Sequence, residues 1–482
     1  MAWEAVIGLE CHIQLRTRTK MFCECEVVFG DEANSHVCPT CLGLPGALPR
    51  LNAGAIRMAL RLGLALGCDI RHESQFARKN YFYPDMPKNY QITQYDRPLF
   101  EHGTLPVVVE GEAREFALTR IHCEEDAGKS FHPERTGDRS RSRVEFNRAG
   151  TPLLELVTEP VLRSPADCAA FLVTLRRLVR ALGISDADME KGQLRCDANV
   201  SLRPEGASLL GVKTELKNLN SIKGVERGVA AEIERQRRAL DSGERIVQAT
   251  LLYDADHDKL AIMRTKEQAH DYRYFPDPDL PLLVVSEAEL EQARASLPEL
   301  PWRRVQRFVA QYGLPPYDAA VLGDSRELAD YYEECAAGLD PKFVANWLMT
   351  EALRAVNERA WDVARWTAQV PAARMADFLG RVARKELPGP LAKQFIGWLA
   401  DEAGGVDELL ARHGVSVKGT AEDLRPIVKA VLDENPGPVA QYLAGKTVTM
   451  GFLVGQVMKK SGGQAVPTLA QQLLIEEMAA RS

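Results

Sequence analysis

Acidic side chains and a histidine recur at the ends of short apolar runs. Glu10 and His12 follow one run, where alternation along a strand would point both side chains to the same face, and Glu124 with Glu125 follows another. The remaining candidates are Glu155, Asp197 and Asn199. One histidine among several carboxylates suits Mg²⁺ or Mn²⁺. The competing interpretation is that each carboxylate is solvated at its strand end, because local patterns do not bring these residues together.

Four cysteines form the second candidate site. Cys23 and Cys25 are followed by Cys38 and Cys41, and glycine and proline nearby allow tight loops. Tetrahedral zinc takes four such thiolates, so the spacing predicts a structural zinc knuckle over residues 21–45. A closed four-sulfur site leaves no open coordination position, and we assign it no catalysis. The alternative is four unrelated buried cysteines.

No phosphate-binding loop of the Walker type is complete in this chain. The tripeptides Gly128-Lys129-Ser130 and Gly445-Lys446-Thr447 both lack the first glycine that the motif requires. Phosphate could instead be held by the segment Arg78 to Tyr90, which alternates cations with aromatic residues. Lysines beside a divalent metal can neutralise a transferring phosphoryl group. The same segment would also suit stacking of single-stranded RNA, or an ordinary packed loop.

The elements that must position these residues indicate an α+β fold followed by helices. Short β-type runs and turns dominate the first part, with helices predicted at Pro165 to Leu182 and Val225 to Leu240. A proline-rich stretch, Tyr274 to Leu283, should resist regular structure. Helical periodicity then continues to the C-terminus. The expected domains are residues 1–292 (mixed α+β), 293–403 (all-α) and 406–482 (small all-α tail).

Composition narrows the functional classes. Apolar residues make up 45% of the chain and charged residues 26%, which excludes a largely disordered protein. The net charge of -7 excludes binding of nucleic acid by overall charge, so contact with RNA must use local patches. No signal peptide or membrane-spanning segment is expected, and we predict a cytoplasmic protein whose thiols are mostly reduced.

Several motifs together resemble the B subunit of bacterial aspartyl/glutamyl-tRNA amidotransferases, from one end of the chain to the other. The motifs are Ile7 to Leu15, Arg78 to Tyr95, His122 to Lys129, Phe146 to Glu155, Leu194 to Leu202, Glu215 to Ser221, Asp271 to Pro276 and, in the tail, Gly451 to Lys460. The resemblance implies a cradle-shaped catalytic domain with a zinc knuckle, a helical domain and a tRNA-contacting tail. It also implies that ATP phosphorylates the side-chain carboxylate of Glu-tRNA(Gln) or Asp-tRNA(Asn), and that ammonia then forms the amide.

The resemblance also assigns roles to individual residues. Glu10, His12, Glu124, Glu125 and Glu155 are expected to bind Mg²⁺ or Mn²⁺. The expected catalytic residues, at the end of an ammonia path and at the phosphoryl-transfer site, are Glu125, Lys79, Tyr81, Lys88 and Asp197. The residues expected near the ATP phosphates are Asn147, Arg148 and Asn199.

Partners follow from what the chain lacks. It carries no amidase signature and no glutaminase cysteine motif, so ammonia must come from another protein. The resemblance implies an amidase A subunit and a small C subunit in a heterotrimer. An aminoacyl-tRNA synthetase is a further expected partner in a larger complex. Two other interpretations stay open on the residues alone. One is a non-catalytic tRNA-binding adaptor, and the other is a zinc hydrolase, which a closed four-sulfur cluster disfavours.

Overall fold

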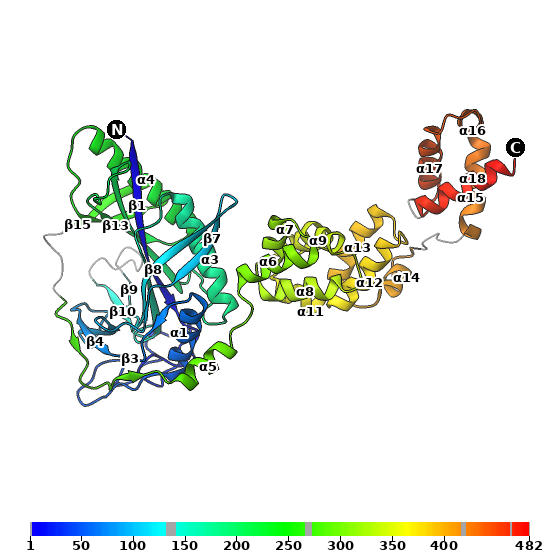
Figure 1. Cartoon of the computed structure of the whole chain (residues 1–482). Helices are drawn as coiled ribbons and strands as arrows, with labels where there is room; N and C mark the ends of the chain where they lie inside the picture. Colours follow the sequence, from blue (N-terminus) through cyan, green and yellow to red (C-terminus); the bar gives the residue numbers. More distant parts are fainter. Residues whose placement is uncertain (1, 132–140, 266–271, 416–420, 463–464, 482) are drawn as a thin grey trace. The chain divides into compact units, whose positions relative to one another are not determined.

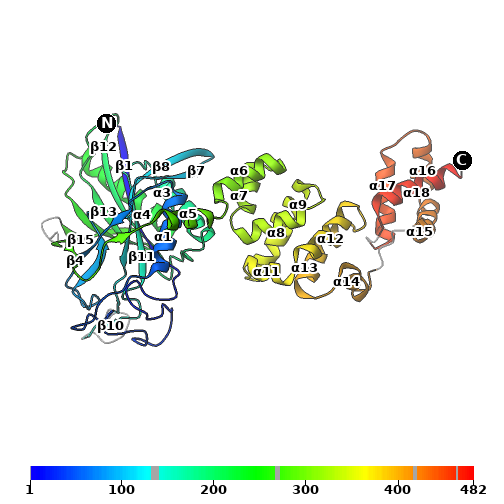
Figure 2. The same cartoon turned by 60° about the horizontal axis from the view of Figure 1, so that its bottom comes forward.

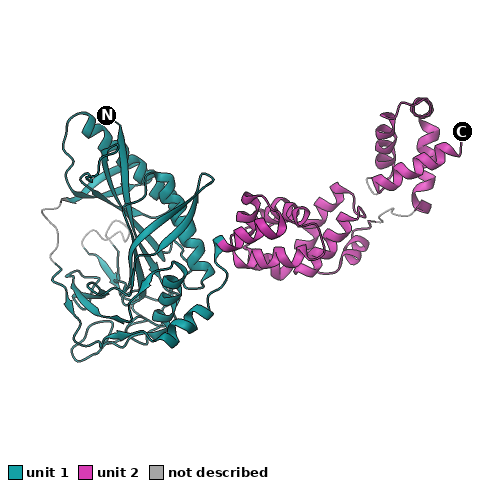
Figure 3. Cartoon of the chain, in the orientation of Figure 1, with its two compact units in different colours: residues 1–302 teal, residues 303–482 magenta. Residues whose placement is uncertain are grey.

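The computed structural model describes residues 2–131, 141–265, 272–415, 421–462 and 465–481. The chain divides into two compact units, Met1–Trp302 and Arg303–Ser482 (Figure 3). Within the described residues every β-strand belongs to the first unit, and the second unit is helical. The predicted sequence of an α+β part followed by a helical part is therefore confirmed.

A mixed sheet of ten strands forms the frame of the first unit (Figures 1 and 2). The neighbouring strands, in spatial order, are β15 (Lys259–Thr265), β14 (Ala249–Asp254), β13 (Thr214–Leu219), β12 (Leu194–Pro204), β1 (Trp3–Gln14), β11 (Pro152–Thr158), β8 (Glu112–Glu125), β6 (Phe100–Glu101) and β2 (Asp69–Ile70), with β7 (Thr104–Val109) paired to β8. All of these pairs are antiparallel except β13 with β14.

Strand β1 lies in the middle of this sheet because its sequence alternates apolar and polar residues. Leu9, Cys11 and Ile13 are buried in the core of the unit, whereas Glu10 and His12 point to the other face and are only partly buried. The prediction that Glu10 and His12 share one face is confirmed. The side chains of Glu10 and His12 thus lie on the opposite side of β1 from the apolar core.

Helices pack on this sheet and contribute to the core, three of them among the described residues before residue 242. They are α1 (Ala53–Ala65), α3 (Pro165–Ala181) and α4 (Ile222–Asp241), and α3 packs against α4 and β7 while α4 packs against β12 and β13. Ser164 caps α3 through a reciprocal pair of hydrogen bonds with Asp167, and Pro165 occupies the first turn. Both helices predicted in this part of the chain are confirmed, with α4 beginning at Ile222.

Three small sheets complete the first unit. They are β16 (Phe275–Pro276) with β4 (Phe76–Asn80) and β5 (Tyr90–Gln94), β17 (Leu283–Val284) with β3 (Glu73–Ser74), and β9 (Lys129–Phe131) with β10 (Arg143–Glu145). The proline-rich stretch contributes only the two-residue strands β16 and β17, as its prolines lead one to expect. Helix α5 (Glu287–Ala295) packs on α1 and ends the unit.

The second unit is a series of helices with a π-helical turn. Its elements are α6 (Pro301–Tyr312), α7 (Pro316–Leu322), α8 (Arg326–Ala336), α9 (Pro341–Trp347), η2 (Leu348–Ala352), α10 (Leu353–Glu358), α11 (Val363–Gln369), α12 (Ala372–Ala383), α13 (Gly389–Asp401), α14 (Val406–Arg412), α15 (Ala421–Glu434), α16 (Pro436–Leu443), α17 (Thr449–Lys460) and α18 (Pro467–Ala479). None of the described helices combines the length and apolar character that crossing a bilayer requires.

Two separate apolar clusters stabilise these helices. One includes side chains from Phe308 to Leu410, and the other includes side chains from Leu424 to Met478. Helix α14 shares the first cluster, because Val406 and Leu409 are buried there. The domain borders at residues 292, 403 and 406 stay predictions.

Candidate active site on the central sheet

The register of four neighbouring strands brings the distant acidic motifs to one place. His12 on β1 lies opposite Glu155 on β11, and Glu155 lies opposite His122 on β8. On the other side of β1, Glu10 lies opposite Asp197 on β12. Residues opposite one another on adjacent strands present their side chains on the same face. One face of the sheet therefore carries the residues that the sequence placed in separate motifs.

Carboxylates and imidazoles on this face lie within ligand distance of one another. His12 Nε2 is 3.4 Å from Glu155 Oε2, 3.6 Å from Glu124 Oε1 and 3.9 Å from Glu10 Oε1. His122 Nε2 is 3.6 Å from Glu124 Oε2 and 3.7 Å from Glu155 Oε2. Two sets of three possible ligands result, Glu10 with His12 and Glu155, and His122 with Glu124 and Glu155, and Glu155 belongs to both. We call these five residues the acid–histidine cluster.

The electrostatics of the acid–histidine cluster favour bound positive charge. Burial alone would lower the pKa of His12, but its hydrogen bond with Glu155 and the charge of Glu124 raise it to about 9. Burial opposes ionisation of Glu155, yet the charges of His122 and His12 hold its pKa well below the usual range. Burial and the charge of Glu155 raise the pKa of Glu10. The site thus attracts a proton or a cation.

The donor chemistry of the acid–histidine cluster fits a divalent metal. Glu124 and Glu155 are buried carboxylates, and buried charges in proteins are normally paired or metal-bound. Carboxylate oxygens together with imidazole nitrogens form a ligand set that suits Mg²⁺ or Mn²⁺. A site made of four sulfur atoms suits zinc instead. Thr93 Oγ1, which donates to Glu124 Oε2 at 3.2 Å, orients one of the carboxylates as outer partners of metal ligands do.

Lys79 lies next to the acid–histidine cluster and adds a cation. Burial would lower the pKa of Lys79, but the charges of Glu124 and Glu155 raise it, so the ammonium stays charged. Its Nζ lies 4.8 Å from the centre of the Tyr272 ring. A half-buried ammonium beside a carboxylate site is suited to neutralise a phosphate.

Glu125 has different partners from its neighbour Glu124. Its side chain is 2% exposed, its Oε1 atom accepts a hydrogen bond from Ile92 N at 2.9 Å, and it forms an ion pair with Lys88 Nζ. Glu125 belongs to neither of the two possible ligand sets formed by the described residues. The structure therefore joins two predicted catalytic residues, Lys88 and Glu125, into one pair beside the acid–histidine cluster.

The other predicted catalytic and phosphate-binding residues are spread over neighbouring positions. Tyr81 stacks on Tyr83 with ring centres 4.6 Å apart, and burial raises its pKa. Asp197 forms an ion pair with Lys217. Asn199 lies two residues further along β12, opposite Gly8, and is partly buried. It follows Asp197 by two residues on this strand and so shares its face.

Asn147 and Arg148 are engaged in holding loops together. Asn147 accepts a hydrogen bond from His36 N at 2.9 Å and donates to Glu32 O at 2.7 Å. Arg148 donates to Ala127 O at 3.0 Å and to Gly128 O at 2.6 Å. These contacts use much of the hydrogen-bonding capacity of both side chains for the backbone, which limits what they can offer to a phosphate.

The predicted zinc knuckle is present as a cluster of four sulfur atoms. One ligand atom from each of Cys23, Cys25, Cys38 and Cys41 lies within 4.8 Å of the others. A tetrahedral zinc with bonds of about 2.3 Å holds its sulfurs about 3.8 Å apart, so the cluster fits that ion. A hydrogen bond from Cys23 and the Cys38 backbone amide lower the pKa of Cys41, which favours its thiolate. Cys11 and Cys123 are fully buried in the core and serve packing.

Sequence reasoning missed three basic or histidine residues of this region, which are His122, Arg195 and Lys217. His122 precedes Glu124 by two positions, and the alternation that paired Glu10 with His12 would have identified it. Arg195 lies opposite His12 on β12, and its Nη2 is 2.9 Å from Asp126 Oδ2. Lys217, the partner of Asp197, carried no local signal, because its place depends on the pairing of β13 with β12.

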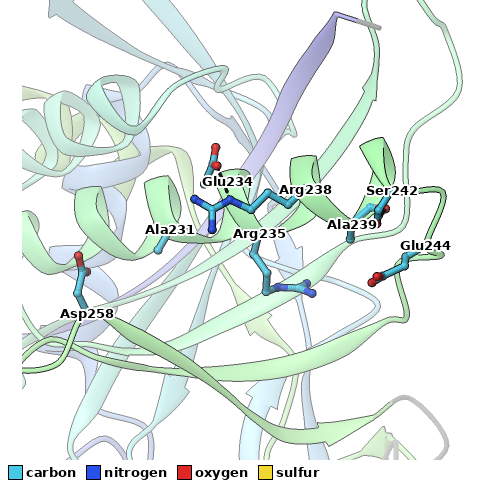
Figure 4. Close-up of a pocket in the computed structure, with 8 residues that line it drawn as sticks. All are labelled: Ala231, Glu234, Arg235, Arg238, Ala239, Ser242, Glu244 and Asp258. Atoms are coloured by element: carbon cyan, nitrogen blue, oxygen red, sulfur yellow. Dashed lines mark hydrogen bonds and ion pairs between the residues drawn. The ribbon is translucent and has the colours of Figure 1, made fainter.

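A surface groove along α4 lies apart from these residues. It has a volume of about 640 Å³. It is lined by Ala231, Glu234, Arg235, Arg238, Ala239, Ser242, Glu244 and Asp258 (Figure 4). Arg238 pairs with Glu234, and Arg235 pairs with the buried Glu232. Because its arginines are already paired and its lining includes no residue of the acid–histidine cluster, we assign the groove no role in the chemistry.

Comparison with known proteins identifies the class to which this sheet and site belong. Residues 5–291 match a family described as the GatB/GatE catalytic domain, and residues 330–478 match a family described as the GatB domain. The first match contains the acid–histidine cluster, the Lys88–Glu125 pair and the cysteine cluster. The second match lies within the helical unit.

Individual relatives extend the similarity over the whole chain. The B subunit of the aspartyl/glutamyl-tRNA(Asn/Gln) amidotransferase of Moorella thermoacetica is 47% identical, covering 99% of this chain and 100% of the relative. Proteins of the same name from Carboxydothermus hydrogenoformans and Chlorobium chlorochromatii are 45% and 46% identical, each over 99% of this chain. The chain belongs to the family of aspartyl/glutamyl-tRNA(Asn/Gln) amidotransferase B subunits, and the resemblance seen in its motifs is confirmed.

Proposed function

We propose that this chain activates the side-chain carboxylate of a misacylated tRNA and converts it into an amide. A carboxylate oxygen of the glutamate or aspartate esterified to tRNA attacks the γ-phosphorus of ATP, and ADP leaves. Ammonia then attacks the carbonyl carbon of the acyl phosphate, inorganic phosphate leaves, and a proton passes from nitrogen to a base. The products are Gln-tRNA(Gln), Asn-tRNA(Asn) or both. Phosphorylation supplies the leaving group that a carboxylate lacks at neutral pH.

The observation that carries this proposal is the acid–histidine cluster. Five residues that could bind a metal converge from β1, β8 and β11, on a face where His12 and Glu10 keep part of their surface open to solvent. Glu10, His12, Glu124 and Glu155, joined by His122, would hold Mg²⁺ or Mn²⁺. When bound, such an ion neutralises the charge of a phosphoryl group in transfer.

Lys88 and Glu125 are proposed as the pair that handles ammonia. Ammonium must lose a proton before its nitrogen can attack, and a buried carboxylate is a suitable acceptor. Lys88 holds the Glu125 carboxylate in place through their ion pair. Glu125 was predicted both as a metal ligand and as a catalytic residue, and its separation from the two ligand sets favours the second role.

The remaining site residues are proposed to surround the substrate. Lys79 would neutralise the γ-phosphate, because its half-buried ammonium already interacts with Glu124 and Glu155. Tyr81 and Asp197 are proposed to line the approach of ammonia and the acyl group. Asn147, Arg148 and Asn199 are proposed to lie near the ATP phosphates, with the first two acting by shaping loops through their backbone contacts.

The rest of the proposal concerns the assembly. A structural Zn²⁺ would occupy the cysteine cluster of the knuckle at residues 21–45. An amidase A subunit would supply ammonia from glutamine and a small C subunit would complete a cytoplasmic heterotrimer, with an aminoacyl-tRNA synthetase as a possible further partner. The first unit would form a cradle around the acyl end of the tRNA, the helical residues 293–403 would follow it, and the tail at 406–482 would contact the tRNA.

The test is amide formation on Glu-tRNA(Gln) and Asp-tRNA(Asn) by the reconstituted complex, with ATP and ammonium chloride as the nitrogen donor. Product from the unaltered chain, and none from a Glu125→Gln variant that still binds tRNA, is the expected result. Binding of tRNA without ATP consumption or amide formation by the unaltered complex would instead support the adaptor function. The chain alone should hydrolyse no glutamine.

A further inference from the structure

Lys20 is a lysine sealed inside the first unit between the cysteine cluster and the loop that follows β10. Its side chain is 0% exposed. Its Nζ donates to His36 O at 2.8 Å and to Phe146 O at 3.1 Å, and it lies 3.7 Å from Cys41 Sγ. The ammonium therefore has three acceptors, two neutral carbonyls and one sulfur.

The charge of Lys20 needs an anion, and the described part of the chain offers it no carboxylate. Among the described residues its partners are two carbonyl oxygens and a sulfur, with no carboxylate. Burying an unpaired ammonium costs several kcal/mol or more, so such groups are nearly always neutralised by a partner. Four thiolates around one zinc ion leave a net negative charge on the cluster, and its sulfur atoms accept hydrogen bonds.

The segment that Lys20 holds leads directly to Glu125. Phe146 is the acceptor of one Lys20 bond, and Met21 N donates to Gly150 O at 2.7 Å. Gly150 has a positive φ of 84°, and a β-carbon added there would be in ordinary contact with two side chains, 3.4 Å from Lys20 Cδ and 3.7 Å from Glu125 Oε2. Gly150 is therefore a neighbour of both Lys20 and the Glu125 carboxylate.

The cysteine loop also touches the partner of Glu125. A β-carbon added at Gly43 would lie 2.9 Å from Lys88 Cα, so only glycine lets the loop backbone pass so close to Lys88. The loop that carries Cys38 and Cys41 is therefore packed against one member of the Lys88–Glu125 pair, and the Lys20 segment is packed against the other.

We propose that Lys20 is a positioning residue, which pairs with the negative charge of the metal-loaded cysteine cluster and thereby fixes the Phe146 to Gly150 loop against Glu125. This inference rests on the zinc assignment proposed above. Loss of the metal releases Cys41 Sγ from its fixed place beside the Lys20 ammonium, and the Phe146 to Gly150 loop loses its anchor. The cysteine cluster then acts on the amide-forming step without touching substrate.

The first test compares Lys20→Met, which keeps the length of the side chain and removes its charge, with Arg18→Met. Arg18 is exposed on the same loop, so its variant removes a positive charge without opening a buried site. Both variants are studied in the reconstituted complex. The measurements are the rate of zinc release to a chelating dye, kcat and KM for ammonium-driven amide formation, and Mn²⁺ binding to the acid–histidine cluster.

Lys20→Met should release zinc about tenfold faster or more, the scale seen when an outer partner of metal ligands is removed. Its kcat should fall by a similar factor, while KM for the aminoacyl-tRNA and Mn²⁺ affinity change little. Arg18→Met should match the unaltered chain in all measurements. Equal zinc release from Lys20→Met and the unaltered chain would overturn the inference and leave the proposed function intact. A purified chain that never holds zinc would instead remove the zinc assignment on which the inference rests.

A second measurement needs no variant and covers the case in which Lys20→Met fails to fold. The unaltered complex is treated with an amine-acylating reagent before and after zinc is removed by a chelator, and labelling of each lysine is followed by mass spectrometry. Lys20 should be protected in the zinc-loaded complex and labelled at least about tenfold faster after removal, since the cysteine loop that encloses its ammonium is then no longer held by the metal. Protection that persists without zinc, with amide formation unchanged, would overturn the inference.

Discussion

His12 on β1 and Glu155 on β11 lie directly opposite one another, with 3.4 Å between His12 Nε2 and Glu155 Oε2. Strand register brings the two residues together, because they are far apart in the sequence. A slip of one residue between β1 and β11 would turn every side chain of the slipped strand to the opposite face. The buried Cys11 and Leu154, which belong to the same two strands, prevent that slip by fixing which face meets the core. The core of the first unit thus specifies the geometry of the acid–histidine cluster.

His122 should be as important for metal binding as His12. We expect His122→Ala and His12→Ala each to weaken Mn²⁺ binding by about tenfold or more, because each removes an imidazole from a site that shares Glu155. Electron paramagnetic resonance of free Mn²⁺ titrated with the chain measures the affinity. His102→Ala is the matched control, because His102 is exposed and pairs with Asp69 away from the cluster. Unchanged affinity in His122→Ala would remove that residue from the proposed metal site.

Removing the charge of Glu124 should cause a different loss of function from removing the charge of the adjacent Glu125. Glu124→Gln should lose both Mn²⁺ binding and ATP consumption, because Glu124 lies 3.6 Å from each of His12 Nε2 and His122 Nε2. Glu125→Gln should keep Mn²⁺ binding within a factor of about two and still lose amide formation by about 100-fold, the scale of a lost general base. The two assays together separate the roles. An equal loss of Mn²⁺ affinity in both variants would show that Glu125 is also a metal ligand.

The elements that the sequence predicted best are those whose pattern is local. The helix predicted at Pro165 to Leu182 from its apolar spacing is α3, Pro165–Ala181, with its cap at Ser164. The shared face of Glu10 and His12 followed from strand alternation. The four cysteines form a recognisable pattern because metal knuckles place their ligands close together in sequence. Each of these inferences depends on a few consecutive residues.

The parts that could not be predicted depend on pairing between distant strands. Nothing local indicates that Glu155 lies beside His12, or that Lys217 faces Asp197, because the order β13-β12-β1-β11-β8 is decided by packing of the whole unit. The different surroundings of Glu124 and Glu125 also depend on β5, which supplies Ile92 N and Thr93 Oγ1 as their separate partners. At the level of sequence, the family resemblance predicts that these motifs form one site, and residue spacing does not.

The stability of the helical unit should depend on pH through Glu333. Its carboxylate accepts hydrogen bonds from Arg307 Nη2 at 2.9 Å and from the Tyr312 hydroxyl at 2.7 Å. The bond from Arg307 is the largest cause that lowers the pKa of Glu333 below 4.5. A group whose pKa is lowered by folding stabilises the folded state above its unfolded pKa and loses that effect as the pH falls through the folded pKa. Glu333 therefore contributes fully above pH 4.5 and progressively less below it.

Calorimetry of the full chain and of Glu333→Gln measures this contribution. The variant should unfold its helical unit with about 1 kcal/mol less stability at pH 7, as expected for a partly exposed charged hydrogen bond. The difference between the two proteins should shrink as the pH falls below 4.5. Glu327→Gln, also on α8 and without these partners, is the control. A difference that stays constant from pH 7 to pH 3 would show that the charge of Glu333 is not its source.

The close approach of α1 to β6 makes Gly63 irreplaceable on packing grounds. A β-carbon at Gly63 would lie 2.3 Å from Cδ1 of Phe100, whose ring is fully buried and cannot move aside. Alanine normally stabilises a helix by about 1 kcal/mol relative to glycine, but forced overpacking costs about 1–3 kcal/mol. Gly63→Ala should therefore lower the stability of the first unit, measured by calorimetry. In a Phe100→Ala background, where the ring is absent, the same substitution should be neutral or stabilising. Equal effects of Gly63→Ala in both backgrounds would mean that Phe100 is not what excludes a side chain from this position.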